Sequence, residues 1–171
     1  VLAGPDGSRY DHGVLGDALE WGALTVVLGG DAETTVTLRL PKTRVFEDID
    51  VRFADVTGDG APEVIVVETD IALGASLAVY GPAGKLAATP FIGQPNRWLA
   101  PAGIADFDGD GRVEIAYVDR PHILGELVFV RMEGARLVET ARLAGLTNHR
   151  IGDDFISGDA GGTTIWAPFP A

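Results

Sequence analysis

An internal repeat restricts the fold of this chain more than any other feature, because each copy of a repeat must adopt the same local structure. Residues 53–67 read FADVTGDGAPEVIVV, and residues 104–118 read IADFDGDGRVEIAYV. The two segments are 51 residues apart, and this spacing continues without a gap as far as Thr89 and Thr140. Twelve of the 37 positions aligned in this way are identical. The sequence therefore predicts two copies of one structural unit.

Each copy is expected to form four short β-strands, because runs rich in β-branched residues alternate with turns that contain Gly, Pro and Asp. The strands expected in the two copies are Val51–Ala54, Glu63–Glu68, Ser76–Tyr80 and Lys85–Phe91, followed by Gly103–Ala105, Glu114–Asp119, Leu127–Met132 and Arg136–Leu143. A four-stranded sheet with two apolar faces cannot bury both faces alone, so the copies are expected to stack on one another.

Partial copies flank the two full units, which span residues 44–96 and 97–149. In the partial unit over residues 1–43, Leu24–Leu28 and Thr35–Leu40 are expected to be the last two strands. In the partial unit over residues 150–171, Asp154–Ser157 and Thr164–Trp166 are expected to be the first two. The 171 residues are thus predicted to form one all-β domain of about three stacked units.

The charge of the chain restricts its partners. The 25 acidic and 13 basic side chains give a net charge of −12, which disfavours nucleic acid and anionic membranes and favours cations. No apolar run approaches the roughly 18 residues that a membrane-spanning helix needs. There is no cysteine, which excludes disulfides and thiolate metal sites. We therefore expect no nucleic-acid partner and no membrane insertion.

The loop of the second copy has the side chains of a calcium site. Its sequence DFDGDGRVE, over residues 106–114, places acids at its first, third, fifth and ninth positions. Calcium takes six to eight oxygen ligands, and glycines let such a loop curl around one centre. The expected ligands are Asp106, Asp108, Asp110, the backbone carbonyl of Arg112, and Glu114. Tyr117 stands where an EF-hand needs glutamate, so an EF-hand is excluded.

The loop of the first copy, over residues 55–63, has one acid fewer. Its expected ligands are Asp55, Thr57, Asp59, the carbonyl of Ala61, and Glu63, and its calcium binding is expected to be weaker. The alternative for both loops is a hairpin turn without a metal, since Asp-Gly is a favoured turn pair. The third copy keeps only Asp159 and is expected to bind no metal.

This loop, repeated at about 50 residues between two short strands, resembles the FG-GAP/VCBS repeat of calcium-binding β-propellers. That family includes the head domains of integrin α-subunits and many secreted bacterial proteins. The resemblance implies that each unit is a four-stranded propeller blade and that the loop between its first two strands binds Ca²⁺. It also implies a secreted or periplasmic protein. The first loop departs from the pattern at Thr57, and the third copy departs at most positions.

A second group of residues is expected at the end of the units opposite the calcium loops. Arg44, Arg97 and Arg150 recur at a spacing of 53 residues, and His122 and His149 lie near them in the expected turns. One hypothesis is an anion site for an acidic sugar or a peptide carboxylate, since arginine suits carboxylates. The alternative is that each arginine pairs with a local acid: Glu47, Asp48 or Asp153. The histidines are then structural, and Trp21, Trp98 and Trp166 pack between units.

Three classes of function remain open, of which the third is a stabilising repeat array cut from a longer protein. The first is an adhesion-like module that recognises a protein or an acidic carbohydrate and uses calcium structurally. The second is a propeller-based polysaccharide lyase or hydrolase that acts on an anionic substrate at the opposite face. No residue pattern identifies a catalytic group. Because about three blades are too few to close a ring, we expect either missing blades in a truncated chain or a homodimer.

Overall fold

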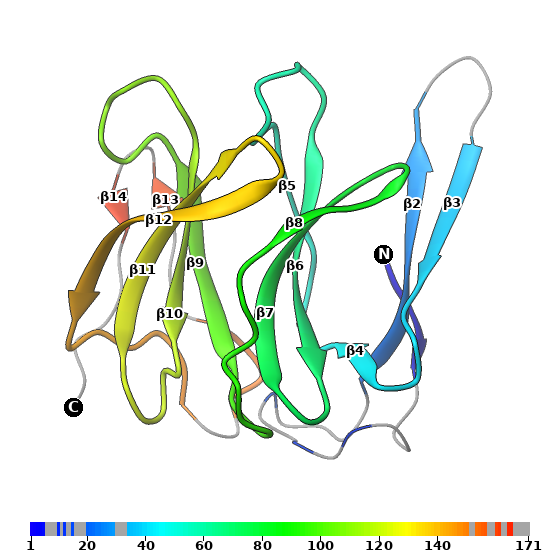
Figure 1. Ribbon diagram of the computed structural model, residues 1–171, viewed down its shortest axis with the longest axis horizontal. Coiled ribbons are helices and arrows are strands. Elements are labelled where there is room, and N and C mark those ends of the chain that lie inside the picture. Colours follow the sequence, from blue (N-terminus) through cyan, green and yellow to red (C-terminus); the bar gives the residue numbers. More distant parts are fainter. Residues whose placement is uncertain are drawn as a thin grey trace.

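The computed structural model describes residues 1–5, 10, 12, 15, 20–29, 34–150, 153–156, 160–161 and 164–165, and these contain strands and no helix (Figure 1). Accordingly, no membrane-spanning helix is found among them. The strands are β1 (Leu2–Pro5), β2 (Trp21–Leu28), β3 (Thr34–Arg39), β4 (Arg44–Phe46), β5 (Arg52–Ala54), β6 (Glu63–Asp70), β7 (Gly74–Gly81), β8 (Gly84–Ala88), β9 (Leu99–Ala105), β10 (Glu114–Asp119), β11 (Glu126–Glu133), β12 (Arg136–Ala144), β13 (Ala160–Gly161) and β14 (Thr164–Ile165). The all-β prediction is confirmed.

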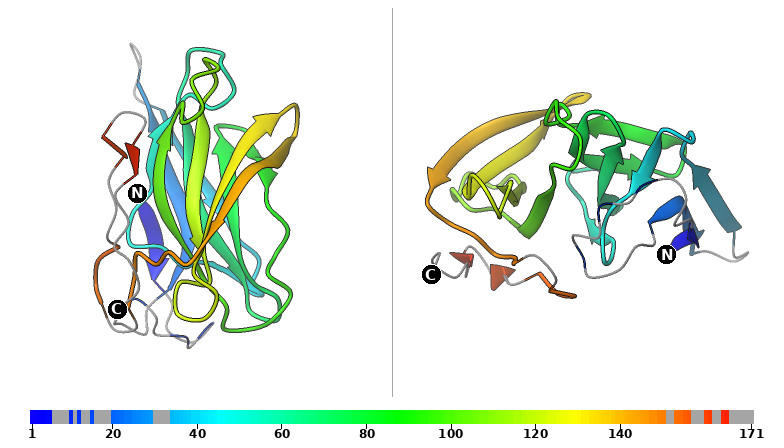
Figure 2. Two further views of the ribbon diagram at one scale, coloured as in Figure 1. Left: turned by 90° about the vertical axis from the view of Figure 1, so that its left-hand side faces the viewer. Right: turned by 90° about the horizontal axis from the view of Figure 1, so that it is seen from below.

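The strands form two large antiparallel sheets and a small hairpin. The eight-stranded sheet has the order β1-β2-β4-β6-β7-β8, with β3 beside β2 and β5 beside β6. The four-stranded sheet has the order β12-β11-β10-β9, so the second copy forms the predicted unit of consecutive strands. The strands of the N-terminal part, the first unit and the second unit follow one another along the long axis of the molecule (Figures 1 and 2).

The first strand of the first unit is interrupted. In the second unit one strand, β9, pairs with β10 from Leu99 to Ala105, with a single bulge between Pro101 and Gly103. In the first unit two short strands, β4 and β5, pair with β6 in the place of that one strand. Residues 47–51 form a longer bulge between them. The Asp48 carboxylate accepts a hydrogen bond from the Val67 amide at 2.9 Å in place of a ladder partner. The bulge gives the first unit two additional residues here. Equivalent residues are therefore 53 apart before it (Arg44 and Arg97) and 51 apart after it (Phe53 and Ile104).

The gap-free alignment of the two copies ends at the second strand. Glu68 lies opposite Ser76, while the equivalent Asp119 lies opposite Glu126, so β7 and β11 are related by 50 residues and not 51. Residues 69–75 separate Glu68 from Ser76, whereas residues 120–125 separate Asp119 from Glu126, so the first unit has one residue more here. The hairpin of the second unit is then longer, with Glu133 opposite Arg136 at its end. Identities after Ser76, such as Val79 with Val130, therefore do not mark equivalent positions.

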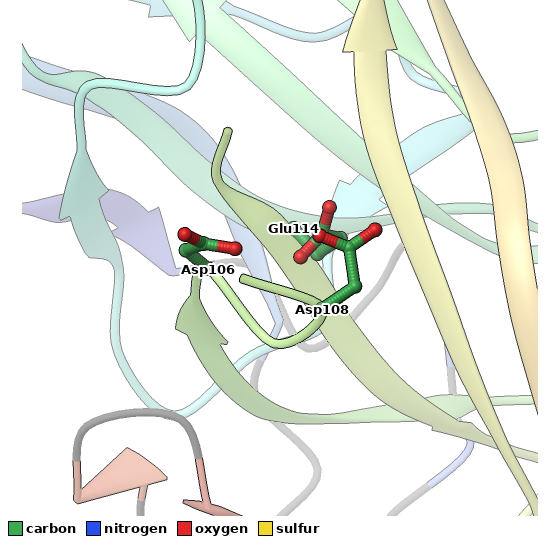
Figure 3. Close-up of side chains that lie close together, drawn as sticks. All are labelled: Asp106, Asp108 and Glu114. Atoms are coloured by element: carbon green, nitrogen blue, oxygen red, sulfur yellow. The ribbon is translucent and has the colours of Figure 1, made fainter. Parts of the chain in front are cut away.

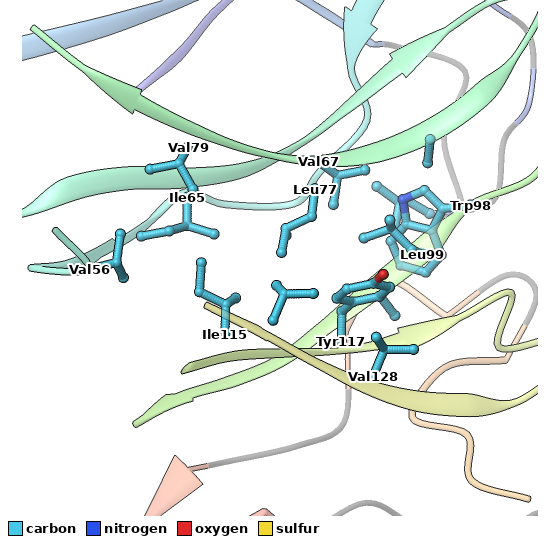
Figure 4. Packing of buried hydrophobic residues seen from close by; sticks show 14 residues of the cluster. Val56, Ile65, Val67, Leu77, Val79, Trp98, Leu99, Ile115, Tyr117 and Val128 are labelled. Atoms are coloured by element: carbon cyan, nitrogen blue, oxygen red, sulfur yellow. The ribbon is translucent and has the colours of Figure 1, made fainter. Parts of the chain in front are cut away.

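The main core lies between the two units (Figure 4). Ile65 lies opposite Val79 and Val67 opposite Leu77, so these four side chains share one face of the first unit. They pack against a face of the second unit that carries Ile115, Tyr117, Val128 and Val130. In the second unit the equivalents of Ile65 and Val67 are Ala116 and Val118. These lie on its other face, in a separate cluster with Leu127. The contact is thus head-to-tail: one face of a unit meets the opposite face of the next.

The other face of the first unit packs against the N-terminal strands. Its side chains Val64, Val66, Ala78 and Tyr80 form a cluster with Leu2, Leu24 and Phe46. The sequence did not predict β1, which pairs with β2 and places Leu2 opposite Leu24. Only one residue pair, Trp21 with Phe46, joins β2 to β4 in the ladder.

The Leu-Gly pair that recurs in both copies marks a close crossing of the chain. Gly74 has φ +78°, and a Cβ atom there would lie 2.4 Å from the carbonyl oxygen of Gln94. Gly125 has φ +62°, and a Cβ atom would lie 2.9 Å from the carbonyl oxygen of Leu146. In both units the glycine lets the segment that leaves the unit pass against the turn after the second strand.

The C-terminal part agrees less well with the prediction. Residues 154–156 form bends and no strand, so the strand expected at Asp154–Ser157 is wrong for these residues, and Ser157 lies outside the described part. Instead, β13 and β14 form a short antiparallel hairpin that includes the expected strand position at Thr164–Ile165. Asp159 and Trp166 lie outside the described residues.

Candidate metal centre

The two acidic loops lie at the same end of the molecule, where β5 turns into β6 and β9 turns into β10 (Figure 1). Both follow the same backbone course. Gly58 and Gly109 each have φ +78°, and Gly60 and Gly111 have φ +89° and +87°. Such left-handed conformations are strained for residues with a Cβ atom, which is why glycine occupies these positions.

The backbone of the second loop is folded around Asp106. Its two carboxylate oxygens accept hydrogen bonds from the amides of Gly109 at 2.7 Å and Gly111 at 2.9 Å. Glu114, at the start of β10, accepts a hydrogen bond from the Phe107 amide through Oε2 at 2.9 Å. The first and last acids of the loop are therefore held in place by the loop itself.

Three carboxylates of this loop converge (Figure 3). Asp106, Asp108 and Glu114 each offer an oxygen, and these oxygens lie within 4.8 Å of one another. Glu114 is only 1% exposed, and its Oε1 is buried without a hydrogen-bond partner. A buried carboxylate oxygen without a partner is costly, and hard oxygen ligands in such a cluster fit a cation such as Ca²⁺. These residues would hold the ion.

The other two residues predicted to bind calcium, Asp110 and Arg112, contact each other through their side chains. Asp110 Oδ2 lies 2.9 Å from Nη2 of Arg112 and 2.8 Å from Nη1 of Arg131. The hydrogen bonds of Arg112, with the charge of Arg131 as a smaller cause, lower the pKa of Asp110. The structure thus brings together three of the four predicted carboxylates and pairs the fourth, Asp110, with cationic side chains.

In the first loop the first and last acids accept the same backbone hydrogen bonds, but the side chains around them differ. Asp55 accepts hydrogen bonds from the amides of Gly58 at 2.7 Å and Gly60 at 2.8 Å. Glu63 accepts from the Val56 amide at 3.0 Å, and the Thr57 hydroxyl lies 3.4 Å from its other oxygen. Asp59 accepts from the amide of Ala61 at 2.8 Å. In the described part of the chain, three acids within 4.8 Å occur only in the second loop.

The three arginines at the opposite end have different surroundings. Arg44 pairs with Glu68 at 3.1 Å and Asp70 at 3.4 Å, and its guanidinium lies over the Phe91 ring. Arg97 donates to the carbonyl of its neighbour Asn96 at 2.9 Å, while Arg150 is exposed. Arg44 is therefore engaged by acids of the first unit, although not by the acids expected from the sequence.

The histidines contact Trp98, which lies between the units. Nε2 of His122 lies 2.8 Å from Nδ1 of His149, whose Nε2 lies 3.1 Å from the Asp153 carbonyl. The Trp98 indole stacks on His122 and meets His149 edge-on, with a centroid distance of 4.9 Å to the latter. Since the Asp153 carbonyl can only accept a hydrogen bond, Nε2 of His149 carries the hydrogen, and Nδ1 of the neutral ring accepts a hydrogen bond from Nε2 of His122. The pair is a connected hydrogen-bond chain with both rings neutral.

Sequence reasoning missed the buried acids beside this cluster. Glu47 is fully buried, and its carboxylate lies 2.5 Å from Nδ1 of His12 and 2.6 Å from the Thr69 hydroxyl. Its backbone carbonyl accepts a hydrogen bond from the Trp98 indole at 2.9 Å. Burial raises the pKa of Glu47, while the hydrogen bonds of His12 and Thr69 lower it. The acid-rich segment over residues 47–50 gave no signal that the Glu47 side chain is buried, because the bulge between β4 and β5 sets its direction.

The histidine pair should make stability fall at acid pH. Burial and the charge of His149 lower the pKa of His122 to about 4, and burial lowers that of His149. The unfolded chain, with histidine pKa values near 6.5, then binds more protons than the folded chain between pH ~6.5 and ~4. The free energy of unfolding is therefore expected to fall by about 1 kcal/mol across this window, after allowance for the partial exposure of His122.

Urea unfolding of the wild type and of His122→Gln at several pH values checks this expectation. The variant keeps a polar side chain but loses one titrating group, so its stability should depend less on pH. The buried acids Glu47 and Asp48, whose raised pKa values act in the opposite direction, are the same in both proteins. Identical slopes for the two proteins would contradict the assignment.

Residues 55–117 match the family model described as an FG-GAP-like repeat. The matched segment starts at the first acid of the first loop and ends within β10, so it contains both acidic loops. No match was found among curated proteins or among solved structures.

Proposed function

Because residues 55–117 belong to the FG-GAP-like repeat family, we propose that the chain is a calcium-binding, propeller-type repeat module. The ion would be held by Asp106, Asp108 and Glu114 in the second loop, and more weakly by the first loop. Bound there, it supplies positive charge and links the end of β9 to the start of β10. The role of the metal in this proposal is structural.

The observation that carries the proposal is the unpartnered oxygen of Glu114. The other oxygens of Asp106 and Glu114 accept backbone hydrogen bonds, so the loop is formed without a metal. Oε1 of Glu114, a member of the cluster, is buried and accepts no hydrogen bond, and a turn without a metal gives no reason for such an oxygen. A divalent cation would satisfy this oxygen and relieve the repulsion among the three carboxylates.

The stacking of the units supports the propeller-type arrangement. Each four-stranded unit presents two apolar faces, and the faces meet head-to-tail, as they would around a ring of blades. The proposal extends to a secreted or periplasmic module that recognises a protein or an acidic carbohydrate. This part rests on the resemblance of the repeats to secreted proteins of the family.

Calcium titration by calorimetry, followed by thermal unfolding with calcium or chelator, tests the proposal. Calcium at a hundredfold excess over Kd should stabilise the protein by about 2.7 kcal/mol per site. Glu114→Gln keeps the size of the side chain and should abolish binding at the second loop. Asp154→Asn removes the same charge from an exposed acid outside the loops and should bind like the wild type. A wild type with no binding heat and an unchanged Tm would overturn the proposal.

A further inference from the structure

We propose that Arg131 is a built-in counter-cation of the second loop, which neutralises its acids when calcium is absent and competes with calcium for them. This inference rests on the proposed calcium site and assigns to it a residue that sets its affinity. Arg131 lies outside the loop, on β11, and the sequence pattern of the loop does not include it.

The geometry places the guanidinium among the acids. Nη1 of Arg131 lies 2.8 Å from Asp110, 3.7 Å from Oε1 of Glu114 and 3.8 Å from Asp108. Oε1 of Glu114 is the oxygen that accepts no hydrogen bond. Arg131 lies at ion-pair distance from it but does not donate a hydrogen bond to it. The side chain of Arg131 is only 16% exposed, which weakens the screening of its charge by water.

The position of Arg131 is fixed by strand pairing. In the ladder between β10 and β11, Arg131 lies directly opposite Glu114. Cross-strand partners have neighbouring Cβ atoms on one face of the sheet, so the arginine side chain has a short path to the loop. Its Nε lies 3.4 Å from Glu133, an exposed acid on the same strand.

The first loop has no such arginine. In the ladder between β6 and β7, Val64 lies opposite Tyr80, so the next residue, Gly81, is the counterpart of Arg131. Glycine has no side chain to reach the loop. The first loop therefore has three acids without this cation, whereas the second has four acids with it. The additional acid, Asp108 in place of Thr57, coincides with the additional positive charge.

A fixed positive charge near a calcium site repels the ion and stabilises the empty site. Arg131→Met keeps much of the aliphatic stem and removes the charge. It should raise calcium affinity at the second loop by at least about tenfold and lower the Tm of the protein in chelator. Arg136→Met is the control, since it removes the same charge from an exposed arginine outside the loop. Its affinity should stay within about threefold of the wild type.

Calorimetric titration of the three proteins and their melting in chelator decide between outcomes. A gain in calcium affinity with Arg131→Met, and not with the control variant, supports the inference. Calcium binding by the wild type with no gain in the variant overturns the inference and leaves the proposed function intact. No calcium binding by the wild type overturns both the inference and the proposed function. Arg131→Gln removes the same charge, should show the same gain, and replaces the Met variant if that variant fails to fold.

Discussion

Replacing Trp98 by alanine is expected to lower the free energy of unfolding by about 4 kcal/mol. Trp98 is 2% exposed and belongs to the core between the two units. Its removal would leave a cavity there and take away the donor to the Glu47 carbonyl, which lies 2.9 Å from the indole nitrogen. The edge-on contact with His149 would be lost as well. Because this one side chain touches both units, its loss should weaken their attachment.

Urea unfolding followed by circular dichroism measures this effect. Trp98→Phe keeps most of the apolar area and loses the hydrogen bond, so we expect a smaller cost of about 1–2 kcal/mol. Phe155→Ala provides the control, because Phe155 is 54% exposed and its truncation should cost less than about 0.5 kcal/mol. A Trp98→Ala protein that loses less than about 1 kcal/mol would refute the role of this residue.

Gly74→Ala is expected to cost about 3 kcal/mol or more. The added Cβ atom would lie 2.4 Å from the Gln94 carbonyl oxygen and 2.8 Å from that of Arg97. Both are backbone atoms, so the connection between the two units would have to shift to make room. The positive φ of +78° adds strain for any residue with a side chain.

Gly134→Ala separates the two causes. Gly134 has φ +61° at the tip of the hairpin between β11 and β12, and an added Cβ atom would meet nothing within 4 Å. Its substitution should cost only the backbone strain, about 1 kcal/mol. Thermal and urea unfolding of both variants give the comparison. Equal costs would mean that the close crossing at Gly74 is not a stabilising feature of the fold.

Most strands could be predicted from the sequence because β-branched runs and turn residues are local signals. The strands β1 and β4 could not. Arg44–Phe46 has only three residues, and it counts as a strand because β6 is long enough to pair with β4 and β5 in succession. The register beyond β6 was also not predictable, since a change of one residue in a turn moves all later pairs. Three identities in the gap-free alignment, at Val79, Leu86 and Thr89, thus arose between non-equivalent positions.

The metal centre likewise has residues that the sequence could predict and residues that it could not. Asp106, Asp108 and Glu114 lie in one nine-residue loop whose glycines set its course, so their convergence could be predicted from spacing. Arg131 could not be assigned to that loop, because its place opposite Glu114 depends on the pairing of β10 with β11. The burial of Glu47 likewise depends on a bulge in the first strand. Sequence spacing is informative within a loop and fails where strands from distant segments meet.

The head-to-tail stacking of the units has a consequence for symmetry. A contact between unlike faces is directional, so a stack built from it has two different ends. Two copies that met through such ends by a two-fold axis would bring like faces together, which is not the contact used inside the chain. If the contact inside the chain is repeated, each new unit is added to the same end of the stack. Addition stops only when the last unit contacts the first. Association of this kind would produce rings or open filaments rather than two-fold pairs.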